Sequence, residues 1–425
     1  MIQNKYYGSR ICYIIEETTH YLISILITGA YLAKLTNTLG FSDSLTAILA
    51  SFVSLGCSVQ LFAIAIFKRG RVKRRVSLLF TIAQLLFMMI YVVPFIEISE
   101  GIKTAIFIGL LLGGYFLFNI VFAPKTNWFM SLIPDNERGV FTSIKEGTSL
   151  IFGIVFQFVM GIVIDRLEGA DNIRGAFVVC GITIFVMTVI HTLSLVFAKE
   201  REPIEKSNKP IFKEFKETVT DKDVMKIILV SVIWSVCNHI SIPFFGTYQI
   251  KELGFSMTFV GTLSIVYSAV RILSSVFLGK YADKYSFAKM LTICHTLVSV
   301  CFLAIVFSNA NNGYVTYTVY YMLYAAGMGG INSAETNIVF DYVAPERRTS
   351  VLAVKQTLGG VLGFVATLAA TPLVEYIQQR GNIVFGRTVY AQQILAAISF
   401  LLVVCLLIYL KKVVYKITPY VIEKY

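Results

Sequence analysis

The stretch LGFS at residues 39–42 occurs again at residues 253–256, roughly half the chain later. Three more sets of residues repeat in the same order at nearly the same spacing: Ala63, Phe67, Lys68 and Lys73 with Gly279, Asp283, Lys284 and Lys289; Thr126-Asn127 with Thr336-Asn337; Arg138 and Lys145 with Arg348 and Lys355. Four matches at nearly one spacing predict that the second half of the chain repeats the fold of the first half, in the same orientation.

The composition predicts that both halves lie in a membrane. Hydrophobic residues make up 56% of the chain and charged residues 15%, and the mean hydropathy is +0.72. A soluble domain keeps about a quarter of its residues charged. Twelve apolar runs are long enough to span a bilayer: 10–35, 43–67, 76–96, 102–124, 142–165, 174–197, 223–250, 256–279, 287–308, 312–340, 350–376 and 388–410. The predicted fold class is therefore an all-α integral membrane protein with about twelve transmembrane helices in two pseudo-symmetric six-helix bundles.

A charged stretch divides the chain nearly in half. Residues 198–223 combine many charges with Pro203 and Pro210, a composition typical of a solvated linker. We therefore expect an N-terminal six-helix bundle over residues 1–200, a cytoplasmic linker over 201–222 and a C-terminal six-helix bundle over 223–425.

The lysine and arginine residues predict the orientation. With the N-terminus in the cytoplasm, 27 of them fall on cytoplasmic segments and 7 on the opposite side. Cytoplasmic loops carry this excess in membrane proteins, so both termini should be cytoplasmic in the inner membrane. The net charge of +12 then reflects topology and contact with anionic lipid, not binding to nucleic acid. Lys5 and Arg10 lead into an apolar run too long for a signal peptide, so no cleaved signal is expected.

Motifs of several other protein classes are missing from the sequence. The seven cysteines are scattered singly, which predicts neither a disulfide framework nor a metal site. A GxxxxGK[ST] loop is absent, so ATP-driven transport would need another chain. Neither HExxH nor GxSxG occurs, so we expect no enzyme activity and no cofactor. We expect the protein to be a monomer.

Three loops resemble one family of membrane transporters. Residues 279–284, GKYADK, resemble the signature that the major facilitator superfamily carries between helices two and three and between helices eight and nine. Residues 134–139 and 345–348 resemble that family's loops four–five and ten–eleven. The resemblance implies two six-helix bundles around a central cavity that opens alternately to each side, with these gate-loop residues: Lys68, Arg71, Arg138, Gly279, Asp283, Lys284 and Arg348.

The chain departs from the family pattern at two places. In the first half, Ala63 and Phe67 occupy the positions of the signature's Gly and Asp, so the acidic latch is missing there. The run that contains Gly147, Gly153 and Gly161 lacks the Gly-Pro signature of drug/proton antiporters, which weighs against that subgroup.

Two charged residues lie deep within predicted spans at equivalent positions of the repeat. A charge near the bilayer centre costs about 2.5–3.5 kcal/mol, so it is rarely there without a partner or a role. Lys125 follows Pro124, where we expect a local break in the helix, and Glu335 lies at the matching place in the second half. We predict that Lys125 and Glu335 face each other across the cavity and pair during transport; the alternative is a static ion pair.

Other polar residues within the spans are further candidates for binding solute or coupling ion. Glu16, Glu17 and His20 lie close together on the first span, where the carboxyls either carry a proton or lie at the headgroup level. Arg271, about two turns from the inner end of its span, binds an anionic group, reaches towards the interface or pairs with an acid. The remaining candidates either line a solute pocket or hydrogen-bond between helices: Asn127, Trp128, Trp234, Asn238, His239 and Asn337.

Together these features predict a secondary active transporter of a small organic solute, driven by an ion gradient, with the proton as the expected ion. The alternatives are a drug or metabolite efflux antiporter of the same fold, a channel, and a membrane receptor that does not transport.

Overall fold

The computed structural model describes residues 6–67, 71–133, 138–200, 211–343, 348–384 and 387–417. Over these residues the chain is almost entirely helical, and its only strands, β1 (Ile383–Val384) and β2 (Arg387–Thr388), form one short antiparallel hairpin. The predicted all-α fold class is confirmed. Within the described residues, nine helical segments are long and apolar enough to cross a membrane, so the count of twelve remains a prediction.

The chain separates into two compact units. Unit 1 comprises Met1–Lys206 and Phe255–Thr262, and unit 2 comprises Ser207–Gly254 and Leu263–Tyr425. The bundle limits expected from the sequence, 1–200 and 223–425, remain a prediction. The helices of unit 1 are α2 (Tyr7–Leu26), α3 (Gly29–Thr38), α4 (Asp43–Ala50), α5 (Phe52–Gly56), η1 (Cys57–Leu61), α6 (Phe62–Ile66), α7 (Lys73–Met89), η2 (Val93–Phe95), α8 (Glu100–Met130), α9 (Arg138–Gly169) and α10 (Ile173–Phe197).

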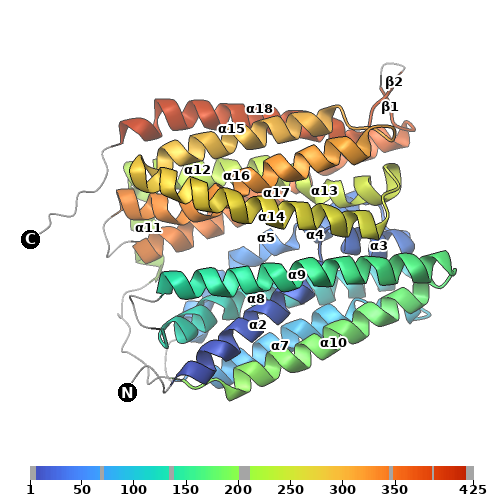
Figure 1. Cartoon of the computed structure of the whole chain (residues 1–425), viewed down its shortest axis with the longest axis horizontal. Coiled ribbons are helices and arrows are strands. Elements are labelled where there is room, and N and C mark those ends of the chain that lie inside the picture. Colours follow the sequence, from blue (N-terminus) through green and yellow to red (C-terminus); the bar gives the residue numbers. More distant parts are fainter. Residues whose placement is uncertain are drawn as a thin grey trace, which may run out of the picture. The chain divides into compact units, whose positions relative to one another are not determined.

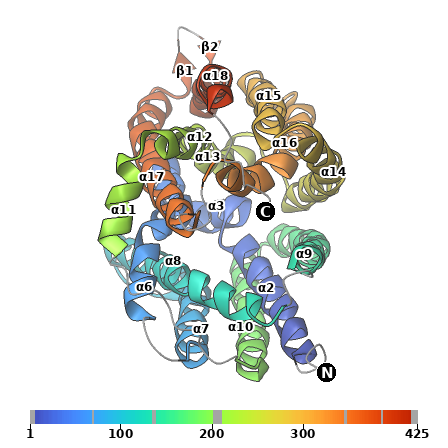
Figure 2. The same ribbon diagram turned by 90° about the vertical axis from the view of Figure 1, so that its left-hand side faces the viewer.

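Unit 2 has the same kind of helix succession. Its long helices α14 to α18 run roughly parallel to one another in Figure 1, and α15 and α16 lie side by side in both Figure 1 and Figure 2. The helices are α11 (Ile211–Thr220), α12 (Lys222–His239), α13 (Ile242–Thr247), the π-helix η4 (Tyr248–Glu252), α14 (Met257–Lys284), α15 (Phe287–Val306), α16 (Gly313–Tyr342), α17 (Arg348–Gln379), α18 (Ala391–Lys412) and η6 (Val414–Lys416). Helix α11 lies in the predicted linker and packs against α17 and α12.

Two predicted spans are interrupted at equivalent places of the repeat. One break follows Leu26, between α2 and α3, and the other follows His239, between α12 and α13. A carbonyl left without its helical partner is costly in a membrane, so neighbouring side chains must satisfy it. Tyr91 donates from its hydroxyl to the Leu26 carbonyl at 2.6 Å, and Thr367 donates to the His239 carbonyl at 2.7 Å. The repeat seen in the sequence thus extends to the local backbone.

The break expected at Pro124 does not occur. Helix α8 runs from Glu100 to Met130 with Pro124 inside it. A proline removes one helical hydrogen bond but need not end a long apolar helix whose neighbours hold it in place. The prediction of a helix break at this point was therefore wrong.

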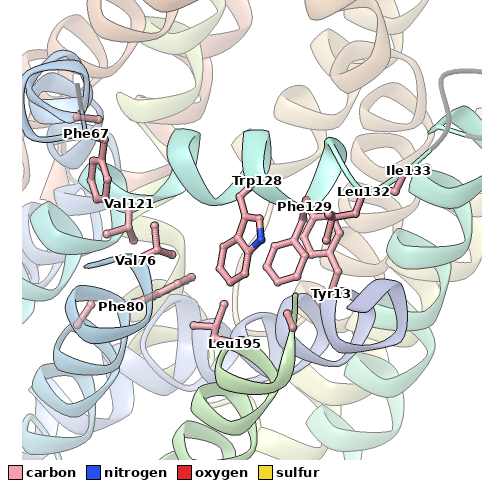
Figure 3. Packing of buried hydrophobic residues seen from close by; sticks show 13 residues of the cluster. Tyr13, Phe67, Val76, Phe80, Val121, Trp128, Phe129, Leu132, Ile133 and Leu195 are labelled. Atoms are coloured by element: carbon pink, nitrogen blue, oxygen red, sulfur yellow. The ribbon is translucent and has the colours of Figure 1, made fainter. Parts of the chain in front are cut away.

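Buried aromatic residues form much of the core of unit 1. Figure 3 shows Trp128 and Phe129 of α8 close to Tyr13 of α2, with Phe80 and Leu195 nearby. The rings of Tyr13 and Phe129 stack at 4.4 Å between centroids, and those of Trp128 and Phe129 at 4.5 Å. This packing joins α2 to α8 and fixes which of their side chains face each other.

The first turns of α14 belong to unit 1 because α9 holds them. Asp165 accepts hydrogen bonds from the backbone nitrogens of Met257 and Thr258, at 2.9 and 2.7 Å. A carboxylate at a helix start satisfies free N–H groups and complements the helix dipole. Gly161 allows this approach, because a Cβ there would lie 2.7 Å from the carbonyl oxygen of Met257.

Glycines of α16 allow close helix packing within unit 2. A Cβ on Gly327 would lie 3.0 Å from the carbonyl oxygen of Cys294, and one on Gly329 would lie 3.0 Å from that of Arg271. Helix α16 therefore approaches both α15 and α14 closely. The contact at Gly329 places the middle of α16 directly against the part of α14 that carries Arg271.

Candidate functional site

A buried lysine lies at the centre of unit 1. The side chain of Lys125 on α8 is fully buried, and its Nζ lies 2.9 Å from Glu16 Oε1 and 3.1 Å from Glu17 Oε2 of α2. The same nitrogen lies 5.1 Å from the ring centroid of Phe80 and 5.5 Å from that of Phe122. Two carboxylates and two aromatic faces therefore stabilise a cation that has no access to water.

Glu17 also connects this lysine to a third helix. Its Oε1 lies 3.3 Å from Nζ of Lys145 on α9. Lys145 in turn lies 5.0 Å from the ring centroid of Tyr13. A hydrogen bond of 3.1 Å between Thr18 and Ser149 holds α2 against α9 close by. Consecutive residues of a helix point about 100° apart, which is why Glu16 and Glu17 can serve different neighbours.

Glu16 has a second partner, a histidine on α10. His191 Nε2 lies 3.1 Å from Glu16 Oε1, and both side chains are fully buried. Since a carboxylate can only accept, His191 donates from Nε2, and its neutral form then leaves Nδ1 as an acceptor. Among the described residues, neither His191 Nδ1 nor Glu16 Oε2 has a hydrogen-bond partner. Two buried acceptor atoms are therefore open to a proton.

His20 lies beside these residues, because its ring and that of His191 both contact Phe80, at 5.2 and 4.4 Å between centroids. The amide nitrogen of Gln84 donates to His20 Nδ1 at 2.9 Å, and the imidazole stacks on Phe118 at 4.5 Å. We refer to the following residues as the charge network: Glu16, Glu17, His20, Gln84, Lys125, Lys145 and His191. Two lysines balance two glutamates in it, so it is neutral overall when both histidines are neutral. No group of three His, Cys, Asp or Glu side chains with metal-binding geometry occurs among the described residues.

Unit 2 contains a cluster of tyrosines. Tyr320 and Tyr324 of α16 stack at 5.5 Å, and Tyr267 of α14 lies 6.2 Å from Tyr324. The hydroxyl of Tyr324 donates to Asn238 Oδ1 at 3.2 Å. The guanidinium of Arg271 lies 5.9 Å from the ring centroid of Tyr267. The candidate span extends from Met257 to Ala282, so Arg271 lies near the middle of that helical segment.

The sequence of the chain matches one family profile over most of its length. The profile of the Major Facilitator Superfamily matches residues 17–367. The chain belongs to the Major Facilitator Superfamily. It is accordingly a multi-pass membrane protein of a transporter family, as the resemblance of its loops predicted.

Individual relatives are distant. The multi-drug resistance efflux pump PmrA homolog of Lactococcus lactis subsp. lactis (strain IL1403) is 23% identical over 308 residues, which is 67% of this chain and 73% of that protein. A crystal structure of the nucleoside transporter NupG superposes with a TM-score of 0.74 at 12% identity, covering 95% of this chain and 99% of the other. A D-xylose-proton symporter superposes with a TM-score of 0.68 at 13% identity, covering 97% and 98%. These structural matches support the superfamily fold.

The structure gives both Lys125 and Glu335 a partner within their own units. Lys125 contacts Glu16 and Glu17, whereas the Nζ of Lys355 on α17 lies 3.5 Å from Glu335 Oε2 and donates to the Glu335 carbonyl oxygen at 2.7 Å. The repeat relates the two positions, but it says nothing about which neighbouring helix each side chain faces. Pairing of Lys125 with Glu335 during transport remains a prediction.

Several other predicted residues have structural contacts. Trp128 donates from Nε1 to the carbonyl oxygen of Lys199 and lies in the core (Figure 3), and Trp234 packs edge-on against His295 at 5.1 Å. Nδ1 of His239 lies 2.8 Å from the Ser235 carbonyl oxygen. For these three residues the interpretation as packing between or within helices fits the contacts. Asn337 is partly exposed, and the side chain of Asn127 lies outside the described residues.

The family's gate loops are described only in part. Arg71 and Lys284 are exposed, and a Cβ on Gly279 would meet nothing within 4 Å. Lys68 lies outside the described residues, and so do the side chains of Arg138, Asp283 and Arg348, although Arg138 begins α9 and Arg348 begins α17. Their role in gating remains a prediction.

The sequence analysis missed two members of the charge network. His191 is one of four histidines in the chain and lies in the apolar run of α10, and Gln84 lies in that of α7. A polar or ionisable residue isolated in an apolar span is itself a functional signal, so His191 could have been found.

Proposed function

We propose that this chain is a secondary active transporter that moves a small organic solute across the cytoplasmic membrane by alternating access, coupled to protons. The observation that supports proton coupling is the contact of Glu16 with His191. Both side chains are fully buried, and each has an acceptor atom with no hydrogen-bond partner among the described residues. A buried ionisable pair of this kind inside a membrane helix bundle is expensive to keep and marks a path for ions or protons.

The charge balance explains how a proton would act. The charge network is neutral, so a proton bound at Glu16 or His191 leaves a buried charge of +1. That excess is relieved if Lys125 moves away from Glu16 or if water reaches the site. Because Lys125 joins α8 to α2, its release changes the contacts between helices, and a proton then favours one conformation over another.

Two candidate functions, uptake and export, differ in the direction of transport. Export of drugs or metabolites is supported by the 23% identity to a protein named a multi-drug resistance efflux pump. An antiporter exchanges a proton for a solute, and a symporter moves both in the same direction. Both would use the same buried groups. We place uptake first, because the structural neighbours that superpose well carry the names of a nucleoside transporter and a D-xylose-proton symporter.

Proteoliposomes with a pH-sensitive dye inside would test transport and coupling together. The panel should contain nucleosides, D-xylose, dipeptides and ethidium, each with a labelled form for counterflow. We expect at least one solute to show counterflow and to carry protons, inwards with the solute for a symporter and against it for an antiporter. Counterflow without proton movement would contradict proton coupling. If no solute of the panel shows counterflow and the purified protein still binds one of them, the receptor interpretation is favoured.

The predicted orientation has a separate test. Both termini are expected in the cytoplasm, because the excess of lysine and arginine lies on that side. Alkaline phosphatase fused after Tyr425 should therefore be inactive, and green fluorescent protein at the same position should fluoresce. An active phosphatase fusion would contradict the proposed topology.

A further inference from the structure

Arg271 is a cation within a candidate membrane span, and no carboxylate in the described part of the chain pairs with it. It lies near the middle of the candidate span Met257–Ala282, and among the described residues no Asp or Glu forms an ion pair with it. At about 1.5 Å per residue, its Cα is about 17–21 Å along the helix from either end of that span. An arginine at such a depth almost always has an acidic partner, a carbonyl or a functional ligand. Its neighbour in the described part of the chain is Tyr267, whose ring centroid lies 5.9 Å from the guanidinium.

The side of α14 that carries Arg271 faces another helix of the same unit. Leu273, Val276 and Phe277 are the strongly exposed apolar residues of this stretch of α14. Gly329 of α16, in contrast, lies so close to Arg271 that a Cβ there would be 3.0 Å from the Arg271 carbonyl. Tyr267, one turn before Arg271, contacts Tyr321 and Tyr324 of α16. Arg271 therefore extends from the side of α14 that contacts α16.

The tyrosine rings near Arg271 are flat, uncharged aromatic surfaces. Tyr267, Tyr321 and Tyr324 are partly exposed, whereas Tyr317 and Tyr320 next to them are buried. Gln249 donates to the Tyr321 hydroxyl at 3.3 Å, and Tyr324 donates to Asn238 at 3.2 Å. These bonds hold the Tyr321 and Tyr324 rings in place, and one face of Tyr324 stacks on Tyr320.

We propose that Arg271 with Tyr267, Tyr321 and Tyr324 forms a binding site for a small organic anion that carries an aromatic ring. The guanidinium donates two parallel hydrogen bonds to a carboxylate or phosphate, a geometry that suits planar anions. The tyrosine rings stack against the flat part of the ligand. That this site binds the transported solute rests on the proposed transport function. Binding of an anion to the purified protein can be measured without transport.

Charge balance supports an anion. Among the residues of unit 2 whose side chains the structure describes, three charged ones lie well inside long helices and are at least partly buried: Arg271, Glu335 and Lys355. Glu335 and Lys355 pair with each other, which leaves Arg271 as the uncompensated charge among them. An anionic ligand neutralises it, whereas a cationic ligand would add to the imbalance.

Binding of defined probes to the purified full chain in detergent tests the site. The probes are benzoate and phenylacetate, with cyclohexanecarboxylate as an anion without an aromatic ring, benzylamine as a cation, and sn-glycerol 1-phosphate as a lipid headgroup analogue. We expect the two aromatic acids to bind and cyclohexanecarboxylate to bind roughly threefold more weakly or worse. Benzylamine should not bind. Equal binding of glycerol phosphate would mean that Arg271 takes lipid phosphate, and the aromatic part of the inference would be wrong.

Variants then assign binding to these residues. Arg271→Ala should weaken benzoate binding about tenfold or more, because it removes charge-assisted hydrogen bonds. Arg271→Lys should recover part of that loss, and Tyr267→Leu should weaken binding with Arg271 intact. Arg380→Ala is the matched control, since Arg380 lies 4.2 Å from the ring centroid of Tyr376, outside the cluster. Size-exclusion profiles identify variants that fail to fold, and Arg271→Gln replaces Arg271→Ala in that case.

Two results would overturn the inference. One is that neither aromatic acid binds the wild-type chain at millimolar concentration. The other is that Arg271→Ala and Arg271→Gln bind benzoate as the wild type does. Neither result affects the counterflow assay, so a transporter of neutral or cationic solutes would remain a transporter. Failure of counterflow of labelled benzoate in proteoliposomes, with intact benzoate binding, would instead contradict the transport function alone.

Discussion

Replacing Lys125 with methionine removes the cation that lies between Glu16 and Glu17. Methionine has a similar length and an apolar side chain, so it can fill the space beside Phe80 and Phe122 without adding a polar group. Glu16 is then left with His191 as its partner, and both carboxylates stay buried or nearly so. Breaking a buried ion pair from one side costs about 3–5 kcal/mol, and here Glu16 loses its one lysine partner while fully buried, although His191 still contacts it and Lys145 still contacts Glu17.

The melting temperature of the protein converts this cost into a measurable shift. For a unit of about 200 residues, 1 kcal/mol corresponds to roughly 2–4 °C, so Lys125→Met should lower the melting temperature by about 6–20 °C. Glu16→Gln should lower the melting temperature less than Lys125→Met does, because Lys125 keeps Glu17 as a partner at 3.1 Å. The double variant should be more stable than Lys125→Met alone, since Glu17 and Lys145 then balance each other.

Thermal unfolding in one detergent, followed by light scattering and by tryptophan fluorescence, provides the measurement. Lys103→Met is the matched control on the same helix: Lys103 pairs with the exposed carboxylate of Glu100 at 3.2 Å, and its loss should cost less than about 1 kcal/mol. If the losses of Lys125→Met and Glu16→Gln simply add in the double variant, the two charges do not interact. The charge network would then be wrong as described.

Three further outcomes follow from particular contacts. Glu16→Gln should reduce uptake driven by a pH gradient at least about tenfold and leave counterflow intact. Glu146 is exposed, so the control Glu146→Gln should change neither activity. Equal loss of both activities in Glu16→Gln would indicate a structural role. Gly329→Ala should destabilise the protein by about 1–3 kcal/mol, because its Cβ would clash with Ser274 Oγ, while Gly279→Ala on α14 has open space and should be neutral or slightly stabilising in thermal unfolding. Glu335→Gln should lower the stability by only about 1 kcal/mol in the same assay, because Lys355 keeps its shorter hydrogen bond to the backbone carbonyl of residue 335. A loss of stability as large as that of Lys125→Met would show that the carboxylate of Glu335 matters more than its 3.5 Å distance from Lys355 Nζ suggests.

The sequence identified the membrane-embedded charged residues of unit 1 but did not predict which of them contact each other. The high cost of charge in a membrane singled out Glu16, Glu17, His20 and Lys125, and the structure brings all four into one network. The partner of Lys125 could not be predicted, because α8 is apolar on nearly all sides. Without a polar stripe the sequence does not fix how a helix is rotated about its axis. The repeat indicates depth, and depth alone led to Glu335.

The breaks after α2 and α12 are a second feature that the sequence alone could not predict. Both helices end where a residue later in the chain satisfies a carbonyl oxygen, Tyr91 in one case and Thr367 in the other. A run of apolar residues contains no signal for such a break, since the hydrogen bond that permits it comes from a distant part of the sequence. Spans could therefore be located from hydropathy, but their interruptions could not.

The two halves of the repeat differ in a way that bears on function. Each half has a lysine in the first third of a long helix, Lys145 and Lys355, in contact with a carboxylate of the same unit. A feature that both halves share is explained by their common fold. The contact of Glu16 with His191 has no counterpart in unit 2, where Val230 and Cys405 occupy the equivalent positions at the spacing of the LGFS repeat.

The converse holds for the arginine of unit 2. At the spacing of the LGFS repeat, Arg271 is equivalent to Cys57, so the first half has no charge at that place. At the spacing that relates Thr126-Asn127 to Thr336-Asn337, Tyr321 and Tyr324 correspond to Leu111 and Gly114 of α8, neither of which is aromatic. Features confined to one half are not required by the fold. Since membrane-embedded charges are costly, we infer that proton handling resides in unit 1 and solute binding in unit 2.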